Sequence, residues 1–359
     1  AMSKVQAISG ATSSELVKLT DKAKEMGSTT KFTAAQSAEA FNYMAMAGWK
    51  PEQMLDGIEG ILNLAAASGE DLGTTSDIVT DAMTAFRMEA SEATHFADVL
   101  ARASSSSNTN VSMMGETFKY VGAMAGTLGY KIEDVGIMIG LMANSGIKAS
   151  QAGTELNSIF TRLATNTNGA TDAIKELGID FFDSSGKARD LIEIVNELRL
   201  ATADYTNEQK TNIANTIAGT RAQAGLLAIL NASEDDYKDL TEAIYSADGA
   251  AQAMADTMLD NLEGSIIKLQ SALDGVKISF GKRLSPYVRG IANWLTDLMP
   301  DIEDGLDRLM DWVDKKIERM KRKFNEIVDT KEWQNADFFG KVHILWDEFI
   351  AQPFTEWWN

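Results

Sequence analysis

The sequence contains an internal repeat, and each copy places a glycine-containing turn ahead of an apolar helical run. The first turn is Ala-Met-Ala-Gly-Trp-Lys-Pro-Glu at residues 45–52, and a looser copy, Gly-Thr-Leu-Gly-Tyr-Lys-Ile-Glu, occupies residues 126–133. The two runs also end alike, in Ala-Ala-Ser-Gly at 66–69 and Ala-Asn-Ser-Gly at 143–146. The sequence thus has two copies of one helix–turn–helix unit, and neither copy contains recognisable catalytic residues. This pattern favours an assembly protein over an enzyme.

Helical spacing of apolar residues dominates the chain, and alternating strand patterns are nearly absent. Leu55, Ile58, Ile61 and Leu62, for example, follow the i, i+3, i+4 rule of an amphipathic helix. Only 4 prolines occur in 359 residues, which leaves long helices unbroken. The predicted fold class is therefore all-α.

Local signals predict where several of these helices begin and end. Capping-box spacings mark three starts, at Thr12 to Glu15, Thr33 to Gln36 and Thr206 to Gln209. Proline suits the first helical position at residues 51 and 286. Glycine, which adopts the left-handed backbone of a helix end without strain, is expected to end helices at residues 27, 48, 69, 129, 146 and 178.

One short segment near residues 179–188 departs from the helical pattern. Its sequence from residue 179, Ile-Asp-Phe-Phe-Asp-Ser-Ser-Gly-Lys, predicts one minor β-hairpin around a Ser-Gly turn. Around it we expect three regions. Residues 1–164 hold the repeated helical units, residues 165–232 form a small helical region with the hairpin, and residues 233–359 form long, tryptophan-rich amphipathic helices.

A heptad seam in the last region predicts a partner helix. The seam alternates steps of four and three through Leu262, Ile266, Leu269, Leu273, Val276 and Phe280. After a one-residue slip the apolar spacing resumes at Leu284, Tyr287, Ile291, Trp294 and Leu298, and Ser285-Pro286 is expected to kink or restart the helix there. A third amphipathic stretch carries Ile302, Leu306, Leu309, Val313, Met320 and Phe324. The partner helix lies either within the chain or in a second copy, and self-association through the seam is one of these two predictions.

Composition excludes several classes of protein and site. A formal net charge of −19 opposes general binding to DNA phosphates, so no sequence-specific nucleic-acid partner is predicted. The chain has no cysteine for disulfides or thiolate metal sites, and its 2 histidines, His95 and His343, are too few for a histidine-rich metal centre. The composition therefore gives no support for a disulfide-stabilised or histidine-rich metalloprotein.

No motif predicts catalysis, a cofactor or a metal. Nucleophile elbows, phosphate loops and HExxH are missing, and acidic residues are too numerous for the sequence to single out a catalytic pair. Residues 165–169 resemble the start of a calcium loop, but Ala164 and Lys175 occupy the first and last ligand positions, where carboxylates are required. We therefore predict a non-enzyme without catalytic, cofactor-binding or metal residues.

Several features keep a membrane-active, pore-forming helical protein as the alternative. Gly122/Gly126 and Gly136/Gly140 have GxxxG spacing, and a basic run covers residues 315–323. Six tryptophans come late: Trp294, Trp312, Trp333, Trp346, Trp357 and Trp358. The longest uncharged apolar stretch, residues 135–147, is shorter than the ~20 residues of a membrane-spanning helix. We therefore favour close helix packing for the glycines, interhelical packing for the tryptophans and a solvated face for the basic run.

An ordered set of short blocks resembles the core region of phage tail tape measure proteins. The blocks, which together cover residues 1 to about 300, are the patterned segments 2–10 and 16–49, Ser106–Asn110, Tyr120–Gly122, Leu128–Tyr130, Ser145–Thr154, Leu177–Ile179 with Gly186-Lys187, Gly219–Gln223, and Leu262–Ser265. Single blocks are weak signals, whereas the set in this order is specific. The chain begins inside the first block and stops at Asn359, so we expect a fragment of a longer protein.

The resemblance implies a structural protein of a phage or prophage tail. Such a protein lies in the lumen of the tail tube, sets tail length while the tube polymerises, and is released ahead of the DNA at ejection. The partners implied are tail tube and tail tip proteins, tail assembly chaperones and, at ejection, the host membrane. The implied locations are the virion tail and, during assembly, the host cytoplasm.

Overall fold

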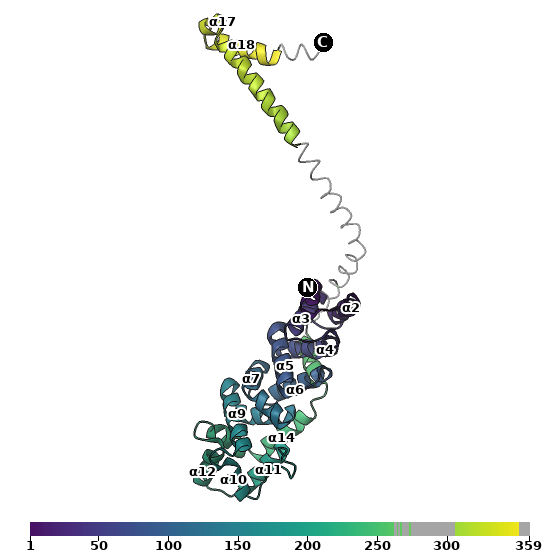
Figure 1. Cartoon of the computed structure of the whole chain (residues 1–359), viewed down its shortest axis with the longest axis vertical. Coiled ribbons are helices and arrows are strands. Elements are labelled where there is room, and N and C mark those ends of the chain that lie inside the picture. The colour runs from purple at the N-terminus through teal and green to yellow at the C-terminus, as the bar shows by residue number, and fades with distance from the viewer. Residues whose placement is uncertain (262–263, 265, 268–272, 274–305, 352–359) are drawn as a thin grey trace. The chain divides into compact units, whose positions relative to one another are not determined.

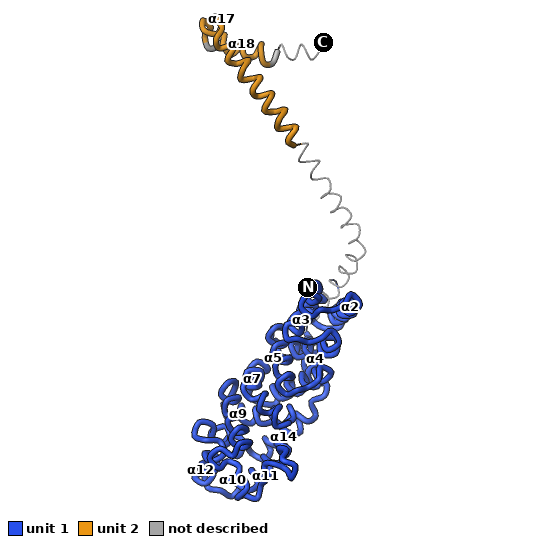
Figure 2. Tube along the Cα trace, viewed as in Figure 1, with its two compact units in different colours: residues 1–279 blue, residues 280–359 orange. Residues whose placement is uncertain are grey.

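The computed structural model describes residues 1–261, 264, 266–267, 273 and 306–351, and it confirms the all-α fold class. The chain divides into two compact units, unit 1 over residues 1–279 and unit 2 over residues 280–359 (Figure 2). The expected three regions, with boundaries near residues 164 and 232, stay a prediction.

The described part of unit 1 is built from short helices (Figure 1). From the N-terminus these are α1 (Met2–Ser9), α2 (Ser13–Thr29), α3 (Ala34–Met46), α4 (Pro51–Ser68), α5 (Leu72–Phe86), α6 (Ala93–Ser105), α7 (Val111–Leu128), α8 (Ile132–Asn144), α9 (Ala149–Thr165), α10 (Ala170–Glu176), α11 (Leu191–Ala201), α12 (Asn207–Ala218), α13 (Gln223–Leu230), α14 (Glu234–Tyr245) and α15 (Ala250–Leu259). Two 3-10 turns, η1 (Ala90–Glu92) and η2 (Thr167–Gly169), precede α6 and α10.

Consecutive helical pairs of unit 1 stack in two rows. Helices α3, α5, α7 and α9 contact one another in order and form one row, while α4, α6 and α8 form the other (Figure 1). Each helix pair contacts its neighbours along the stack, which is the packing principle of helical repeat proteins. The sequence repeat therefore corresponds to α3–α4 and α7–α8, two pairs of the same stack.

Helices α14 and α15 run back along one row of the stack. Helix α14 packs on α8 and α6, and α15 packs on α6 and α4. We call residues 234–259 the strap. Because the strap contacts three helices of the row, it joins residues 234–259 to parts of the chain more than 100 residues earlier.

The predicted helix starts are confirmed. Thr12, Thr33 and Thr206 each accept a backbone N–H from the residue three positions on, whose own side chain accepts the backbone N–H of the threonine. These reciprocal bonds satisfy donors that the helix itself leaves unpaired. Pro51 occupies the first turn of α4 as expected, whereas Pro286 lies outside the described residues.

The repeated turns end their helices in the same way. Gly48 and Gly129 have φ of 87° and 75°, a left-handed backbone that glycine adopts without strain. The next residue in each copy, Trp49 or Tyr130, is buried and donates its N–H to a carbonyl five residues earlier, at 3.1 Å and 3.0 Å. These are the bond and the apolar contact of a Schellman cap, so the two turns are structurally equivalent.

The prediction that glycine ends a helix is confirmed at some of the other positions and wrong at one. Gly69, Gly146 and Gly178 also have positive φ at helix ends, as predicted. The prediction was wrong for Gly27, which lies inside α2. A Cβ at Gly27 would lie 2.5 Å from the backbone nitrogen of Ala34, so this glycine serves a close approach between chain segments rather than a helix end.

Three of the four GxxxG glycines allow close helix packing, as predicted. A Cβ on Gly126 would overlap the Ala85 carbonyl oxygen at the end of α5, and a Cβ on Gly140 would lie 2.7 Å from Leu240 of the strap. Gly136 differs, because its Cβ would meet Val99 at 3.7 Å, an ordinary contact. Close packing between helices thus accounts for three of the four glycines, with Gly122 also close to Ala85.

The predicted hairpin is present in minimal form. Within the described residues it has a single antiparallel bridge, Phe182 to Ala188, rather than two extended strands. The carboxylate of Asp183 accepts the N–H groups of Ser185 and Lys187, at 2.8 Å and 3.0 Å, and so closes the turn. This Asx-type bonding holds the Ser-Gly turn without a longer ladder.

The described part of unit 2 is a long helix with two short ones folded against it. The long helix covers residues 306–328, followed by α17 (Lys331–Asn335), α18 (Phe338–Trp346) and the π-helical turn η3 (Asp347–Ala351). The rings of Phe324 and Trp333 meet edge to face, with centroids 5.9 Å apart. This contact confirms interhelical packing for Trp333.

We predict that Gly126→Ala destabilises unit 1 by about 2 kcal/mol, because the new methyl group must displace the backbone of α5. The matched control is Gly136→Ala, where space is available and the substitution should be neutral or stabilising by up to about 1 kcal/mol. Urea unfolding of both variants measures the difference. Equal effects would show that the α5–α7 approach is not tight.

Candidate assembly surfaces

A buried carboxylate of the stack binds the end of the strap helix α15. Asp98 of α6 is 4% exposed, and its two oxygens accept the N–H groups of Gly249 and Ala251, both at 2.8 Å. These donors belong to the first turn of α15, where a helix leaves N–H groups unpaired and carries partial positive charge. Asp98 therefore caps a helix that lies about 150 residues further along the chain.

Three other charged side chains cap helices across the fold. The carboxylate of Glu155 in α9 accepts the N–H of Gly225 in α13 at 2.6 Å. Arg162 donates to the Ile217 and Thr216 carbonyls at the end of α12. Arg199 donates to the Ile229 carbonyl in the last turn of α13 and to the Ala232 carbonyl just after this helix. Acids bind N-terminal ends and bases bind C-terminal ends, as the helix dipole requires.

A cluster of titratable groups lies where the strap meets α6 and α8. The His95 ring contacts the carboxylates of Glu133 at 2.8 Å and Asp248 at 3.2 Å. Partial burial lowers the pKa of His95, but the hydrogen bonds and charges of these two carboxylates outweigh it and raise the pKa above its usual value. The His95 ring therefore bridges the strap and α8 through Asp248 and Glu133.

Asp134 is the buried acid of the same cluster. Its carboxylate accepts the hydroxyl of Tyr245 at the end of α14, and it is 1% exposed. Burial raises the pKa of Asp134 to about 6, although the Tyr245 hydrogen bond acts in the opposite direction. The pKa of Tyr245 is also raised, first by burial and then by its bond to Asp134.

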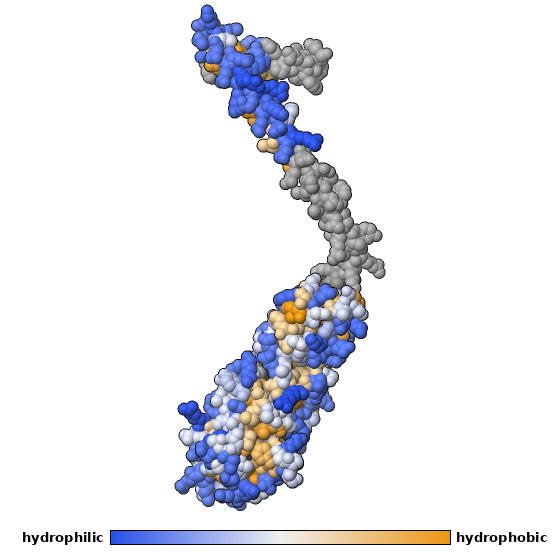
Figure 3. All heavy atoms as spheres, viewed as in Figure 1, coloured by the Kyte–Doolittle hydropathy of each residue, from blue (hydrophilic) through white to orange (hydrophobic). Residues whose placement is uncertain are grey.

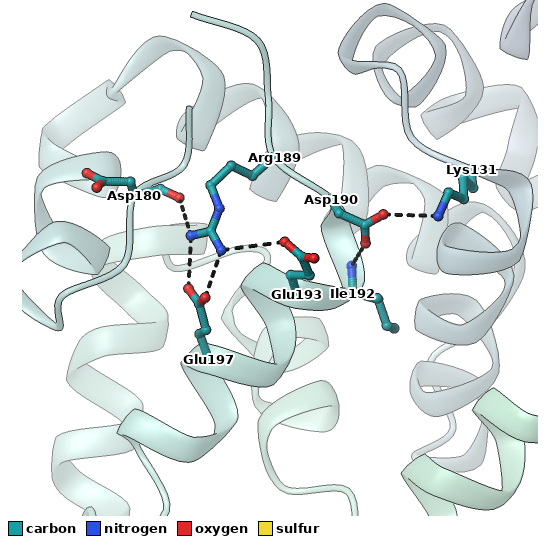
Figure 4. Close-up of polar contacts among 7 residues, drawn as sticks. All are labelled: Lys131, Asp180, Arg189, Asp190, Ile192, Glu193 and Glu197. Atoms are coloured by element: carbon teal, nitrogen blue, oxygen red, sulfur yellow. Dashed lines mark hydrogen bonds and ion pairs between the residues drawn. The ribbon is translucent and has the colours of Figure 1, made fainter. Parts of the chain in front are cut away.

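A second polar cluster joins the hairpin segment to α11 and to the second repeat turn (Figure 4). Arg189 makes a bidentate pair with Glu197, at 2.7 Å and 3.0 Å, and also donates to the Asp180 carbonyl. Asp190 accepts the N–H of Ile192 in the first turn of α11 and the ammonium of Lys131 at 3.1 Å. Lys131 belongs to the repeated turn, so this turn also anchors the following region.

These clusters bind helix ends and neighbouring helices. Within residues 1–261 and the other described parts, no group of three or more histidine or acidic side chains is placed to hold a metal ion. No described helix combines the length and apolarity needed to cross a membrane. What the geometry does support is packing of one helix on another.

Most residues of the predicted 262–280 seam are outside the part of the chain that the structure describes. Leu262, Leu269, Val276 and Phe280 lie outside the described residues. Ile266 and Leu273 are described and are 47% and 51% exposed. Self-association through this seam therefore stays a prediction.

Unit 2 presents an apolar groove that the sequence did not single out. Residues of the long helix and of α18 line it: Ile317, Met320, Lys321, Phe324, Asn325, Val342, Leu345, Trp346 and Phe349 of η3. On the face drawn in Figure 3, apolar spheres lie between hydrophilic ones over this part of the chain.

The expectation of interhelical packing was wrong for Trp312 and Trp346, which are 57% and 58% exposed, while Trp294, Trp357 and Trp358 lie outside the described residues.

The basic run of the long helix is exposed and partly paired, as expected for a solvated face. Lys315 contacts Asp311 at 3.5 Å, Lys321 contacts Glu318 at 2.9 Å, and Lys323 contacts Glu348 at 2.9 Å. Exposed pairs of this kind contribute little to stability. Lys316, Arg319 and Arg322 are also exposed.

The chain belongs to a family of phage tail proteins. The family of phage-related minor tail proteins matches residues 20–219, more than half of the chain and all within unit 1. The chain is similar to the tape measure protein of Pneumococcus phage Dp-1, with 37% identity over 298 residues, which cover 83% of this chain and 26% of that protein. It is also similar to the probable tape measure protein of Escherichia phage P2, with 28% identity over 284 residues, 76% of this chain and 34% of that protein.

The chain thus spans about a quarter to a third of the length of these curated relatives. No solved structure matches it. The tape measure relatives favour a phage tail protein over the membrane-active alternative, and they confirm the resemblance of the sequence blocks to this family.

We predict that Asp98→Ala destabilises unit 1 by about 2 kcal/mol, because two N–H groups at the start of α15 lose a charged acceptor. The control is Asp248→Ala, which removes a 92% exposed side chain of the same segment and should change stability by less than about 0.5 kcal/mol. Urea unfolding measures both. A loss for Asp248→Ala as large as for Asp98→Ala would contradict the capping role.

Asp134 should make unit 1 less stable as pH rises from about 4 to 6. Its pKa is about 6 in the fold and near 3.8 in the unfolded chain, so the folded state holds the proton longer and loses up to about 3 kcal/mol across this window. Asp134→Asn keeps an acceptor for Tyr245 and should remove this loss. The free energy of unfolding, measured from pH 4 to 7 for both proteins, gives the difference, and parallel curves would exclude the effect.

Proposed function

We propose that this chain is the core region of a phage or prophage tail tape measure protein and acts as a structural, non-enzymatic component. The observation that carries the proposal is the family match over residues 20–219, together with two tape measure relatives aligned over most of the chain. In this role the protein lies in the lumen of the tail tube, sets tail length during assembly and leaves ahead of the DNA at ejection.

The helical build of the chain suits a length-setting role in one part more than in the other. A continuous helix advances about 1.5 Å per residue, so its length is proportional to its residue number. Unit 1 folds back on itself through the strap and does not keep this proportion. The long helix of residues 306–328 does keep it, so we assign length-setting to extended helices of this type and a packing role to unit 1.

The partners proposed follow from the same role. They are tail tube and tail tip proteins, tail assembly chaperones, further copies of the chain through the 262–280 seam, and the host membrane at ejection. The net charge of −19 suits a protein that lies in the path of DNA without binding it. The proposed locations are the virion tail and, during assembly, the host cytoplasm.

Tail length in the phage or prophage that encodes the chain tests the proposal. We insert four heptads, 28 residues, between residues 307 and 308 of the long helix, which keeps the apolar residues on both sides of the insertion on one face of the helix. The insertion should lengthen the tail by about 42 Å. The control inserts 28 flexible residues between Ser184 and Ser185, in the exposed hairpin turn, and should leave the length unchanged. Electron microscopy of purified tails gives mean lengths, and mass spectrometry shows whether the chain is present. Tails without the chain, or equal lengths in both variants, would refute the proposal.

A further inference from the structure

The long helix of unit 2 has an apolar seam that the short helices cover only in part. Its members alternate steps of four and three: Leu306, Met310, Val313, Ile317, Met320, Phe324 and Ile327. Ile327 is buried, whereas Leu306 and Met310 are 54% and 58% exposed. Ile317, Met320 and Phe324 also keep large exposed fractions, because they form the floor of the open groove beside α18. A seam of this kind is stabilised when a second helix covers it.

Charge divides the same helix into two halves of opposite sign. The half over residues 306–314 carries Asp307, Asp311 and Asp314 against one cation, Arg308. The half over residues 315–323 carries one acid, Glu318, among six cations: Lys315, Lys316, Arg319, Lys321, Arg322 and Lys323. Parallel pairing of two such helices would bring the strongly basic halves together, whereas antiparallel pairing places each basic half beside an acidic one.

We propose that two copies of the chain associate through antiparallel pairing of this helix, with the 306–314 half of each copy seated in the groove of the other. A register centred on residue 315 sets Leu306 against Phe324, Met310 against Met320, and Val313 against Ile317 of the second copy. Every layer then joins two apolar side chains. Because the arrangement is two-fold symmetric, each layer occurs twice.

The same register gives the interface an ion pair. Asp307 flanks the seam on the side on which Lys321 of the second copy lies, and the Lys321 side chain lines the groove. A helix seated between the long helix and α18 also covers Val342 and Trp346, which are otherwise half exposed or more. The acidic half argues against an anionic lipid surface as the occupant, since Asp307 and Asp311 flank its most exposed apolar residues. The pairing is a property of unit 2 and does not depend on the tail role.

Cross-linking of the full chain tests the register, since the sequence has no cysteine of its own. Met310→Cys and Met320→Cys are prepared separately and treated with a short bismaleimide, alone and as an equal mixture. In the antiparallel register the two copies of residue 310 lie about 15 Å apart along the helix axis, and so do the two copies of residue 320. Neither variant should therefore cross-link alone. The mixture should give at least about tenfold more cross-linked dimer than either variant.

Each other pattern overturns the proposal. Efficient cross-linking of each variant with itself would show parallel pairing. A dimeric mass by light scattering without the mixed cross-link would place association elsewhere, for example in the 262–280 seam. A monomeric mass with no cross-link would show that the groove is not filled by a second copy.

Charge reversal tests the ion pair on exposed residues, where folding is little affected. Asp307→Lys should weaken the dimer by about tenfold in sedimentation equilibrium, and adding Lys321→Asp should restore it. Arg308→Glu is the matched control, because position 308 faces away from the seam, and should change the dissociation constant by less than about twofold. An unchanged dimer in Asp307→Lys, or no recovery in the double variant, would overturn the register.

Discussion

The structure depends above all on satisfying the polar ends of short helices inside a packed stack. Each helix leaves N–H groups at its start and carbonyl groups at its end without an internal partner. In a long helix these ends are few and reach solvent, but unit 1 consists of many helices whose ends meet other helices. The chain satisfies them locally with threonine caps and glycine turns, and at a distance with buried charges such as Asp98 and Glu155.

The distant caps also decide how the stack closes. Asp98 binds the start of α15, His95 and Asp134 contact the strap beside it, and Lys131 of the second repeat turn anchors α11 through Asp190. Loss of the buried Asp98 leaves unpaired groups in a buried place, which costs more than loss of an exposed pair such as His95–Asp248. The strap and the stack are therefore expected to form one cooperative body.

Unit 2 is different, since many of its described apolar side chains are exposed and its charges lie at the surface, which suits contacts with other chains.

Features that depend on neighbours in the sequence could be predicted, and features that depend on distant segments could not. The caps at Thr12 and Thr33 and the turns at Gly48 and Gly129 involve residues within five positions, so the sequence shows them directly. The prediction for Gly27 was wrong because a glycine at a close approach between chain segments has the same sequence signal as one at a helix end.

The caps across the fold had no local signal, because their partners lie 30 to 153 residues away. A weak hint was present at Asp98, an acid set among apolar residues on a buried helix face. The open groove of unit 2 was missed because its lining comes from two stretches of the chain, residues 317–325 and 342–349, which only the fold brings together. Native-state hydrogen exchange tests most directly the central claim that the strap and the stack form one cooperative body. We predict that the amides of α15 exchange with the same opening free energy as those of α4 and α6, since the buried caps join strap and stack into one unit. Exchange of α15 through an opening several kcal/mol less costly than that of the stack would contradict this account.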